Sequence, residues 1–335
     1  MRLLKYIGKR ILMMIPTVFI MSFVVFFIIQ LPPGDFVSGY IARMTAQGEI
    51  FSSEMIAEMR AAYGLDRPWY IQYFYWIKGI IMEGDFGYSF SYYRPVWSVI
   101  MDRLGLTIAV SLITMLFTYL VSLPIGIYSA NHQYSPGDYF VTFLGFIGMA
   151  APNFLLAIIL MYMMYKWTGV AYVGLFSQEM LQNGIHWYNF PEFLRRMILP
   201  LIVIGTSGTC GIIRTIRAQM LDEQSKQYTL TARAKGVSER KITYKYCLRA
   251  ALNPVVSGLA TSLSGIFTGS TITAIVMNLA IQGPVLYTAL LNQDMYLAGT
   301  ILLVQAFLIV LGTLISDIVL GILDPKIRGE QLHEA

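Results

Sequence analysis

A basic stretch between two apolar segments is the part of this sequence whose residue types and spacing best indicate chemistry. It runs from Thr229 to Pro254 and reads TLTARAKGVSERKITYKYCLRAALNP. Between Arg214 and Arg249 the chain carries nine Lys and Arg residues but only three Asp and Glu residues. A short basic loop between membrane spans is expected on the cytoplasmic side. Its cations can form ion pairs with carboxylates of a second protein.

The same stretch has the pattern of a helix, a break and a second helix. The segment from Ala232 to Lys235 favours helix, Gly236 interrupts it, and Ser238 can cap the helix that follows. Lys241 stands where a capping box would have Glu or Gln, so only half of that motif is present. The residues predicted to dock a partner are Thr231, Ala232, Arg233, Ala234, Lys235, Gly236, Ser238 and Arg240. The alternative is a basic amphipathic helix that lies on anionic lipid.

Motifs for catalysis are missing from the sequence. There is no GxxxxGK[ST] phosphate loop, so the chain is not expected to hydrolyse ATP itself. No HExxH motif occurs, and His132, His186 and His333 stand apart without metal-ligand spacing. Ser207 lies in GTSGT, which lacks the second glycine of GxSxG. We predict no catalytic residue, no metal site and no cofactor in this chain.

The composition is that of an integral membrane protein. Of 335 residues, 56% are hydrophobic and 13% are charged, whereas a soluble domain has about 25% charged residues. The net charge of +5 comes from the N-terminal segment and the basic loop, and does not indicate binding to nucleic acid. Cys210 lies in an apolar segment and Cys247 in the basic loop, so we expect no disulfide.

Long apolar segments predict an all-α, polytopic membrane protein with six transmembrane helices. A helix needs about 20 apolar residues to cross the hydrocarbon core. The predicted spans are 11–31, 104–130, 139–165, 197–213, 255–280 and 296–322. A cleaved signal peptide is the alternative for the first, but its apolar run is too long and no small-x-small site precedes Pro32. Six spans place both termini and the basic loop in the cytoplasm.

The polar region 32–103, between the first two spans, is expected to form a helical extracytoplasmic insertion. Ser52 or Ser53 can cap a helix that stops at Gly64. Pro68 suits the first turn of a second helix, which is rich in Trp and Tyr. That aromatic helix can rest at the membrane interface or form the footprint of an external binding protein.

Several strings, in this order along the chain, resemble one family of transporter subunits. They are LPPGD, GLDRPWYIQY, EGDFGYS and PVWSVIMDRL, then TARAKG, SERK and LRAALNP, and finally DPKIRG. All are similar to permease subunits of bacterial ATP-binding-cassette importers, in the oligopeptide, dipeptide and nickel branch. In the general importer motif, Glu-Ala-Ala stands where this chain has Leu230, Thr231 and Ala232 before Gly236. The missing Glu and first Ala are usual in the peptide branch.

The resemblance implies the type I importer permease fold and a set of partners. The basic loop would form a coupling helix that docks into a groove on a cytoplasmic ATPase. The assembly would contain a second homologous permease subunit, two cytoplasmic ATP-binding subunits that hold ATP and Mg, and an extracytoplasmic solute-binding protein. Its place would be the cytoplasmic membrane of a bacterium or archaeon. The implied divisions are 1–31, the external region 32–103, the transmembrane core 104–322 with its coupling loop 214–254, and the cytoplasmic tail 323–335.

Polar or kink-forming residues within the spans are candidates for the translocation path. Pro152 interrupts the third span because proline removes a backbone hydrogen bond. Small polar residues at 205–211 can serve either the path or helix packing. The candidate path residues are Pro152, Asn153, Ser207, Thr268, Ser270 and Thr271. Asp317 is expected to pair with Arg214 or Arg217 rather than to relay protons.

Other classes of function, and the substrate, stay open on the sequence alone. A channel or ion-coupled transporter would need intramembrane carboxylates or paired broken helices, and the spans are almost free of charge. A membrane-embedded enzyme would need a nucleophile and a base. The expected substrate is an oligopeptide or dipeptide, with an oligosaccharide as the alternative. MNLAIQGPVLYTALLNQDMYLAG departs from the acidic-hydrophobic segment and Pro-Gly turn that the peptide branch typically shows.

Overall fold

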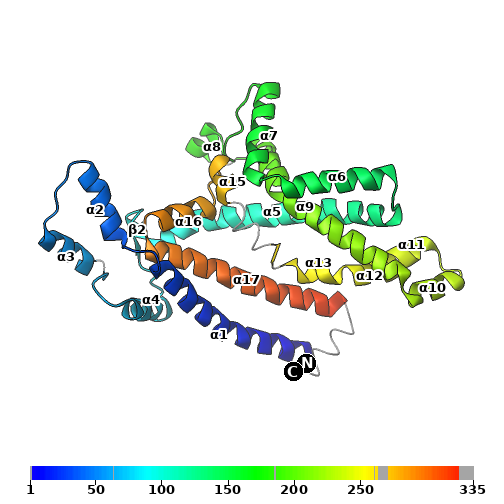
Figure 1. Ribbon diagram of the computed structural model, residues 1–335, viewed down its shortest axis with the longest axis horizontal. Coiled ribbons are helices and arrows are strands. Elements are labelled where there is room, and N and C mark those ends of the chain that lie inside the picture. Colours follow the sequence, from blue (N-terminus) through cyan, green and yellow to red (C-terminus); the bar gives the residue numbers. More distant parts are fainter. Residues whose placement is uncertain (1, 63, 185, 260, 263–270, 324–335) are drawn as a thin grey trace. The chain divides into compact units, whose positions relative to one another are not determined.

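The computed structural model describes residues 2–62, 64–184, 186–259, 261–262 and 271–323. Helices make up most of this described chain (Figure 1), which confirms the predicted helical class. The strands in the described part of the chain form one short antiparallel hairpin. In it, β1 (Tyr88–Ser89) pairs with β2 (Arg94–Pro95), with Tyr88 opposite Pro95.

Contacts divide the chain into two compact units. Unit 1 is formed by Met1–Ile11, Ile108–Ala280 and Ile309–Ala335, and unit 2 by Leu12–Thr107 and Ile281–Leu308. Three long helices, α1 (Arg2–Gln30), α5 (Val96–Asn131) and α17 (Met295–Leu323), contribute residues to both units.

Several of the described helices are long and apolar enough to cross a membrane. Four pass this criterion singly: Arg10–Gln30 within α1, all of α5, α9 (Phe190–Ser225), and Met295–Leu320 within α17. A bent pair, α6 (Pro136–Ala150) and α7 (Asn153–Thr168), passes it jointly. The predicted fifth span, 255–280, falls partly outside the described residues. The helices agree with the prediction of a multi-pass membrane protein.

The predicted interruption at Pro152 is a sharp break between α6 and α7. The direction of the chain bends by 107° between the two helices. Ala151, directly before the proline, has an extended backbone with ψ 128°, as the steric demand of the proline ring favours. Pro152 is extended as well and precedes the first turn of α7. The third span is therefore broken into two helices rather than gently kinked.

Unit 2 contains three helices between the first two long helices, of which the second and third were predicted. They are α2 (Phe36–Ala46), α3 (Ser53–Ala62) and α4 (Trp69–Glu83). The start of α3 at Ser53, the positive φ of Gly64 (66°) and the position of Pro68 just before α4 all confirm the prediction. Helix α16 (Gln282–Leu291) starts at a Gln-Gly-Pro string that comes just after the predicted fifth span, 255–280. Proline is tolerated in this first turn because its missing N–H would have no helical partner there.

A buried carboxylate connects the hairpin of unit 2 to α17. Asp294 is fully buried and accepts hydrogen bonds from Ser89 Oγ at 2.6 Å, the Ser91 amide at 2.9 Å and the Leu297 amide at 3.3 Å. Burial raises the pKa of Asp294 above its ordinary value, although these three donors act in the opposite direction. The apolar core beside it is built by Val96, Val99, Ile100, Val285, Leu286, Ala289, Leu297, Ala298 and Ile301.

Unit 1 is organised around α9, which is much longer than the predicted fourth span, 197–213. It has 36 residues and is therefore about 54 Å long, against a hydrocarbon core of about 30 Å. The segment 214–225, which we assigned to a loop, is the continuation of this helix. The assignment of 214–225 to a loop is therefore wrong, because the charged turns after Ile213 keep helical geometry.

Small residues let α5 and α9 pack closely. A Cβ added at Gly126 of α5 would lie 2.8 Å from Ile216 Cγ2 and 3.1 Å from the Ile213 carbonyl of α9. At Gly205 of α9 it would lie 3.2 Å from Thr118 Oγ1 of α5. Glycine at such positions lets membrane helices approach, so helix packing accounts for part of the 205–211 segment.

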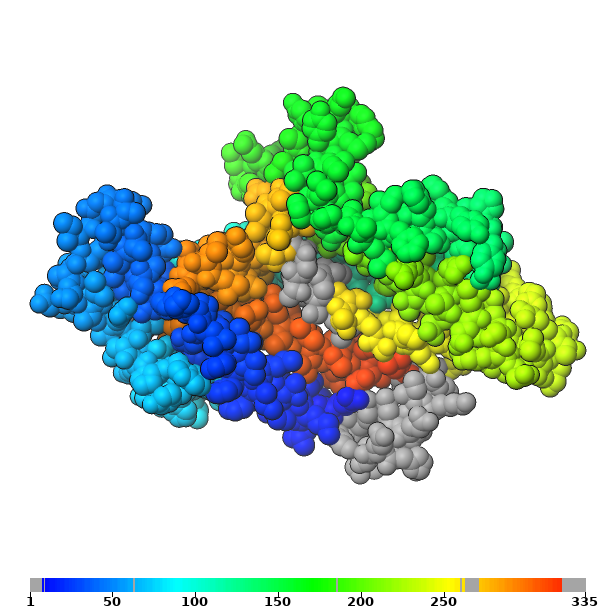
Figure 2. Space-filling view, viewed as in Figure 1, coloured from blue at the N-terminus to red at the C-terminus, as the bar shows by residue number. Residues whose placement is uncertain are grey.

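Short helices complete unit 1 in the described part of the chain. They are α8 (Gln178–Asn183), α10 (Gln227–Ala234), α11 (Glu239–Lys241), the π-helical turn η1 (Ile242–Cys247), α12 (Leu248–Ala251), α13 (Asn253–Ser257) and α15 (Thr271–Val276). Helices α10 and α11 follow the end of α9 and are drawn in yellow-green at the surface in Figure 2.

Candidate functional site

The corner between α9 and α10 is held by a buried carboxylate. Glu223 accepts hydrogen bonds from Tyr228 Oη and from Lys226 Nζ, the latter at 2.6 Å, and is only 7% exposed. Its backbone carbonyl accepts a hydrogen bond from Thr229 Oγ1 at 2.9 Å. Lys226 has an extended backbone between the two helices (φ −71°, ψ 150°). These contacts fix the direction in which α10 leaves α9.

The break between α10 and α11 is made by Gly236, as predicted. Its φ of +73° lies in the left-handed region, which glycine enters at little cost. The Val237 amide donates back to the Ala232 carbonyl at 3.1 Å, and the Gly236 amide donates to the Arg233 carbonyl at 2.9 Å. Together they close the end of α10. A Cβ at Gly236 would meet no heavy atom within 4 Å, so the backbone conformation, and not space within the chain, requires glycine.

Helix α11 begins after Ser238, which has the extended backbone of an N-cap residue but makes no capping hydrogen bond through its side chain. The prediction that Ser238 occupies the cap position is confirmed, whereas its hydroxyl does not serve the cap. Arg233 and Glu239 instead bridge the break, with Arg233 Nε 2.8 Å and Nη2 3.2 Å from the Glu239 carboxylate. This pair is exposed and adds little to stability.

One face of the basic loop belongs to the core of unit 1. Ala232 of α10 packs with Ile242 and Cys247 of η1, and this cluster includes Ile216 and Met220 of α9. Thr229, also buried, lies 3.8 Å from the Cys247 sulfur through its Oγ1. We expected Ala232 to allow close approach of a partner, but it lies in this core. Its small side chain serves packing within the chain.

The opposite face of the loop is exposed and basic. Of the eight residues predicted to dock a partner, all but Ala232 are exposed: Thr231, Arg233, Ala234, Lys235, Gly236, Ser238 and Arg240. A shallow hollow of about 370 Å³ lies beside them, lined by Ser238, Arg240, Lys241 and Tyr244. A surface of this kind can receive carboxylates of another protein.

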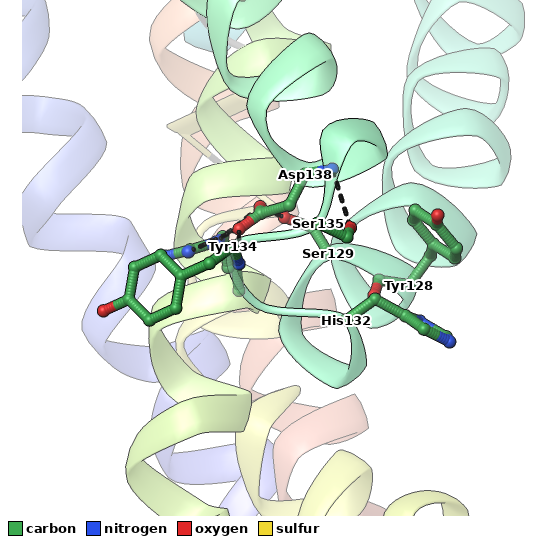
Figure 3. Close-up of polar contacts among 7 residues, drawn as sticks. Tyr128, Ser129, His132, Tyr134, Ser135 and Asp138 are labelled. Carbon is green, nitrogen blue, oxygen red and sulfur yellow. Dashed lines mark hydrogen bonds and ion pairs between the residues drawn. The ribbon is translucent and has the colours of Figure 1, made fainter.

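A buried ion pair connects α9 to the first turn of α6. Arg217 donates from Nε and Nη2 to the two carboxylate oxygens of Asp138, each at 2.9 Å. The same carboxylate accepts hydrogen bonds from Ser129 Oγ and from the Tyr134 amide (Figure 3). The Asp138 amide in turn donates to Ser135 Oγ at 3.2 Å, which caps α6. The Asp138 side chain is 3% exposed.

This ion pair corrects an expectation from the sequence. We expected Asp317 to pair with Arg214 or Arg217, but its partner is Arg10, with Nη1 and Oδ2 3.2 Å apart. Arg217 is already engaged by Asp138. The signal that was overlooked is Asp138 itself, since a carboxylate at the start of an apolar helix needs a cationic partner.

Arg214 lies in a groove between α6 and α9. The groove has a volume of about 750 Å³ and is lined by residues of both helices, including Tyr139 and Phe146. The Arg214 guanidinium lies 5.6 Å from the Phe146 ring centre and donates to Met149 Sδ at 3.5 Å. A cation over an aromatic face is a favourable contact, so Arg214 packs against α6.

The residues predicted for the translocation path lie on neighbouring elements. Helix α7 contacts both α9 and α15. Pro152 is exposed, directly before α7, and Asn153 is its first residue. Ser207 is exposed on α9 and Thr271 begins α15. Thr268 and Ser270 lie outside the described residues.

Comparison with known proteins gives matches along nearly the whole chain. A family model described as "Binding-protein-dependent transport system inner membrane component" matches residues 122–329. A second, described as "Binding-prot-dependent transport system membrane comp, N-term", matches residues 3–111. Between them the two matches leave out little more than the middle of α5 among the long described helices.

Curated relatives align over their full length. The chain is 32% identical over 324 residues to the oligopeptide transport system permease protein AppB of Bacillus subtilis, covering 96% of this chain and 99% of the relative. It is 30% identical over 327 residues to OppB, an oligopeptide transport system permease protein of Haemophilus influenzae, covering 97% and 100%. It is also 30% identical over 343 residues to the dipeptide transport system permease protein DppB of Escherichia coli, covering 97% and 99%.

Proposed function

Since the chain belongs to the family of binding-protein-dependent transport system inner membrane components, we propose that it forms half of the translocation path of an ATP-driven importer. The exposed basic face of α10 and α11 is the surface that a cytoplasmic ATPase subunit binds. The observation that carries this assignment is the combination of exposed Lys235 and Arg240 with a rigidly anchored helix beneath them.

Anchoring is what makes this surface suitable for coupling. A docked partner would push on α10, whose buried face packs against η1 and α9. The Glu223 corner ties α10 to α9, and the Arg217–Asp138 pair ties α9 to the first turn of α6. A displacement of α10 is therefore passed to helices of the membrane core rather than absorbed by a flexible loop. Coupling through a contiguous network of packed and hydrogen-bonded groups is a physical route for such a signal.

The membrane topology that fits this role has six spans. The bent pair of α6 and α7 counts as the third span, and the fifth is the apolar segment 255–280 predicted from the sequence. Both termini, the α5–α6 turn and the basic loop then face the cytoplasm. This orientation is supported by the excess of Lys and Arg in the N-terminal segment and in the loop.

The proposed partners follow from this role. They are a second permease subunit, two ATPase subunits that bind ATP and Mg, and an external solute-binding protein. The chain itself lacks the phosphate loop that ATP hydrolysis requires. ATP binding would bring the ATPases together and move α10 and α11, and the spans would open to receive substrate. Pro152, Asn153, Ser207 and Thr271 are proposed to line the path.

The proposed substrate is a short peptide. The relatives named above are oligopeptide and dipeptide permease proteins, and they match the whole length of this chain. Mass spectrometry of the ligand held by the co-purified solute-binding protein tests this assignment. Detection of a bound peptide supports peptide import. Detection of a bound glycan would contradict it and support oligosaccharide import instead.

Charge reversal tests the docking surface. The double variant Lys235→Glu, Arg240→Glu replaces two exposed cations, and is expected to lose both the co-purifying ATPase and ATP-driven uptake while the permease still inserts. Lys166→Glu is the matched control, because Lys166 is an exposed cation in the last turn of α7, far along the chain from the loop. Uptake and co-purification that are equal in the double variant and the control would refute the docking role.

A further inference from the structure

Helix α4 packs against the membrane-spanning part of α1. The Tyr73 hydroxyl lies 2.9 Å from Ser22 Oγ in a buried hydrogen bond. Tyr73 also makes an edge-to-face contact with Phe23, whose ring centre is 5.3 Å away. Trp69 meets Phe27 at 5.5 Å between ring centres. Such aromatic pairs are favourable, so the two helices form a packed interface.

The position of these contacts along α1 gives the depth of α4. The candidate span of α1 ends at Gln30, and Ser22 lies eight residues before this end. At a rise of 1.5 Å per residue, Ser22 is about 12 Å inside a layer about 30 Å thick. Aligning α1 with the membrane normal therefore places Tyr73 well below the interface.

A second helix gives the same depth independently. Trp76 of α4 belongs to a buried cluster with Leu303 of α17, and its ring lies 3.5 Å from where a Cβ on Gly299 would stand. The candidate span of α17 begins at Met295, so Gly299 and Leu303 lie four and eight residues, about 6 and 12 Å, inside it. Two membrane-spanning helices thus place one face of α4 at about the same level.

The other face of α4 is apolar and exposed. Tyr70, Phe74, Ile81 and Met82 are 58–73% exposed, and in Figure 2 α4 is drawn in light blue at the surface, beside the dark blue of α1. Ile20 and Val24 of α1 are exposed apolar side chains as well. Only Lys78 and Glu83 are charged among the fifteen residues of α4, and a lysine can extend its ammonium to the polar layer.

We propose that α4 is a membrane-inserted helix whose exposed face contacts lipid acyl chains. The inference goes beyond the expectation that this aromatic helix rests at the membrane interface or forms the footprint of an external binding protein. If this face were in water, a large apolar surface would be exposed to solvent, which is unfavourable. Acyl chains suit the apolar composition of this face, and the buried face of α4 lies at their depth. The proposal depends on the membrane-spanning nature of α1 and α17 and not on the identity of the transported molecule.

Spin labels in the assembled transporter, reconstituted in lipid nanodiscs, test the proposal. A nitroxide is attached to Phe74→Cys on the exposed face of α4. Ile20→Cys on α1 is the lipid control, and Ile50→Cys, at a site 93% exposed between α2 and α3, is the water control. The two native cysteines are buried, and the labelled parent chain measures their background.

Collision with oxygen, which dissolves in acyl chains, is compared with collision with a water-soluble nickel chelate. The label at 74 is expected to match the label at 20, with an oxygen-to-nickel ratio several-fold above that at 50. A ratio equal to that at 50 would show a water-facing helix and overturn the proposal. Low accessibility to both reagents would show that protein covers this face and would overturn it as well. Tyr70→Cys, one turn away, repeats the measurement if the label at 74 disturbs folding.

Discussion

Arg217 and Asp138, 79 residues apart, form a two-point ion pair in which each guanidinium donor lies 2.9 Å from a carboxylate oxygen. Two parallel hydrogen bonds fix orientation as well as distance. Six residues beyond Arg217, the same helix reaches Glu223 and the corner that leads into α10. The α5–α6 turn and the base of the basic loop are thus held to one stretch of α9.

Loss of the Asp138 charge is expected to destabilise the chain. Asp138→Asn leaves Arg217 with a neutral partner in a mostly buried site, and breaking such a pair costs about 3 kcal/mol. Denaturation of the purified chain in detergent measures the change. Asp222→Asn is the control, because the pair of Asp222 with Lys226 is exposed and such pairs contribute about 0–1 kcal/mol. Equal effects in the two variants would contradict a special role for the Arg217 contact.

Two glycines of α5 are expected to respond oppositely to alanine. Gly126→Ala places a methyl group 2.8 Å from Ile216 Cγ2 and 3.1 Å from the Ile213 carbonyl, and overpacking of this kind costs about 1–3 kcal/mol. Gly105→Ala meets no heavy atom within 4 Å, and alanine favours helix over glycine by up to about 1 kcal/mol. The melting temperatures of both variants, measured by thermal denaturation in the same detergent, test this difference. A stabilised Gly126→Ala variant would mean that α5 and α9 are less closely packed.

Stability is expected to fall at alkaline pH through Tyr228. Burial first, and then the hydrogen bond to Glu223, raise the pKa of Tyr228 to about 12. A group whose pKa is raised on folding stabilises the folded state fully below its unfolded pKa, here about 10, and this stabilisation is lost as the pH rises toward 12. The melting temperature of the chain should therefore decline between about pH 10 and pH 12.

Tyr228→Phe removes this titration and should make the decline shallower. The decline does not vanish, because the Glu223 and Asp222 carboxylates also raise the pKa of Lys226, in that order of effect. Tyr244→Phe, an exposed tyrosine of the same loop, is the control and should leave the pH profile as in the parent chain. A Tyr228→Phe profile identical to the parent would exclude Tyr228 as the titrating group.

Local features of the fold were predictable from single residues. Gly236, Pro152, Pro68 and Ser52 each act on the backbone at or next to their own position, through a positive φ, a missing N–H or a cap. The structure has breaks and helix starts at these places. The same reasoning overestimated the loop after Ile213, because charged residues can continue a helix once it leaves the membrane.

Long-range partners were not predictable in this way. The Arg217–Asp138 and Arg10–Asp317 pairs join residues that are far apart in sequence. Periodicity carries little information about pairing when the spans are apolar on all sides. The burial of Ala232 was not predicted for a related reason. It depends on contacts with η1 and α9, and the local sequence pattern does not show that these elements pack against α10.

Gly236 provides the sharpest test of the basic loop. Its φ of +73° disfavours a β-branched residue, yet apart from its chain neighbours no heavy atom of the described residues lies within 4 Å of a Cβ there. Gly236→Val is therefore expected to distort the break and reduce ATP-driven uptake strongly, while the permease still inserts because the core under α10 is untouched. Gly236→Asn is the matched variant, since asparagine tolerates the left-handed conformation, and it should retain most of the uptake.

If both variants lose uptake equally, close approach of the ATPase, and not backbone conformation, requires glycine. Full uptake in Gly236→Val would contradict docking at this break.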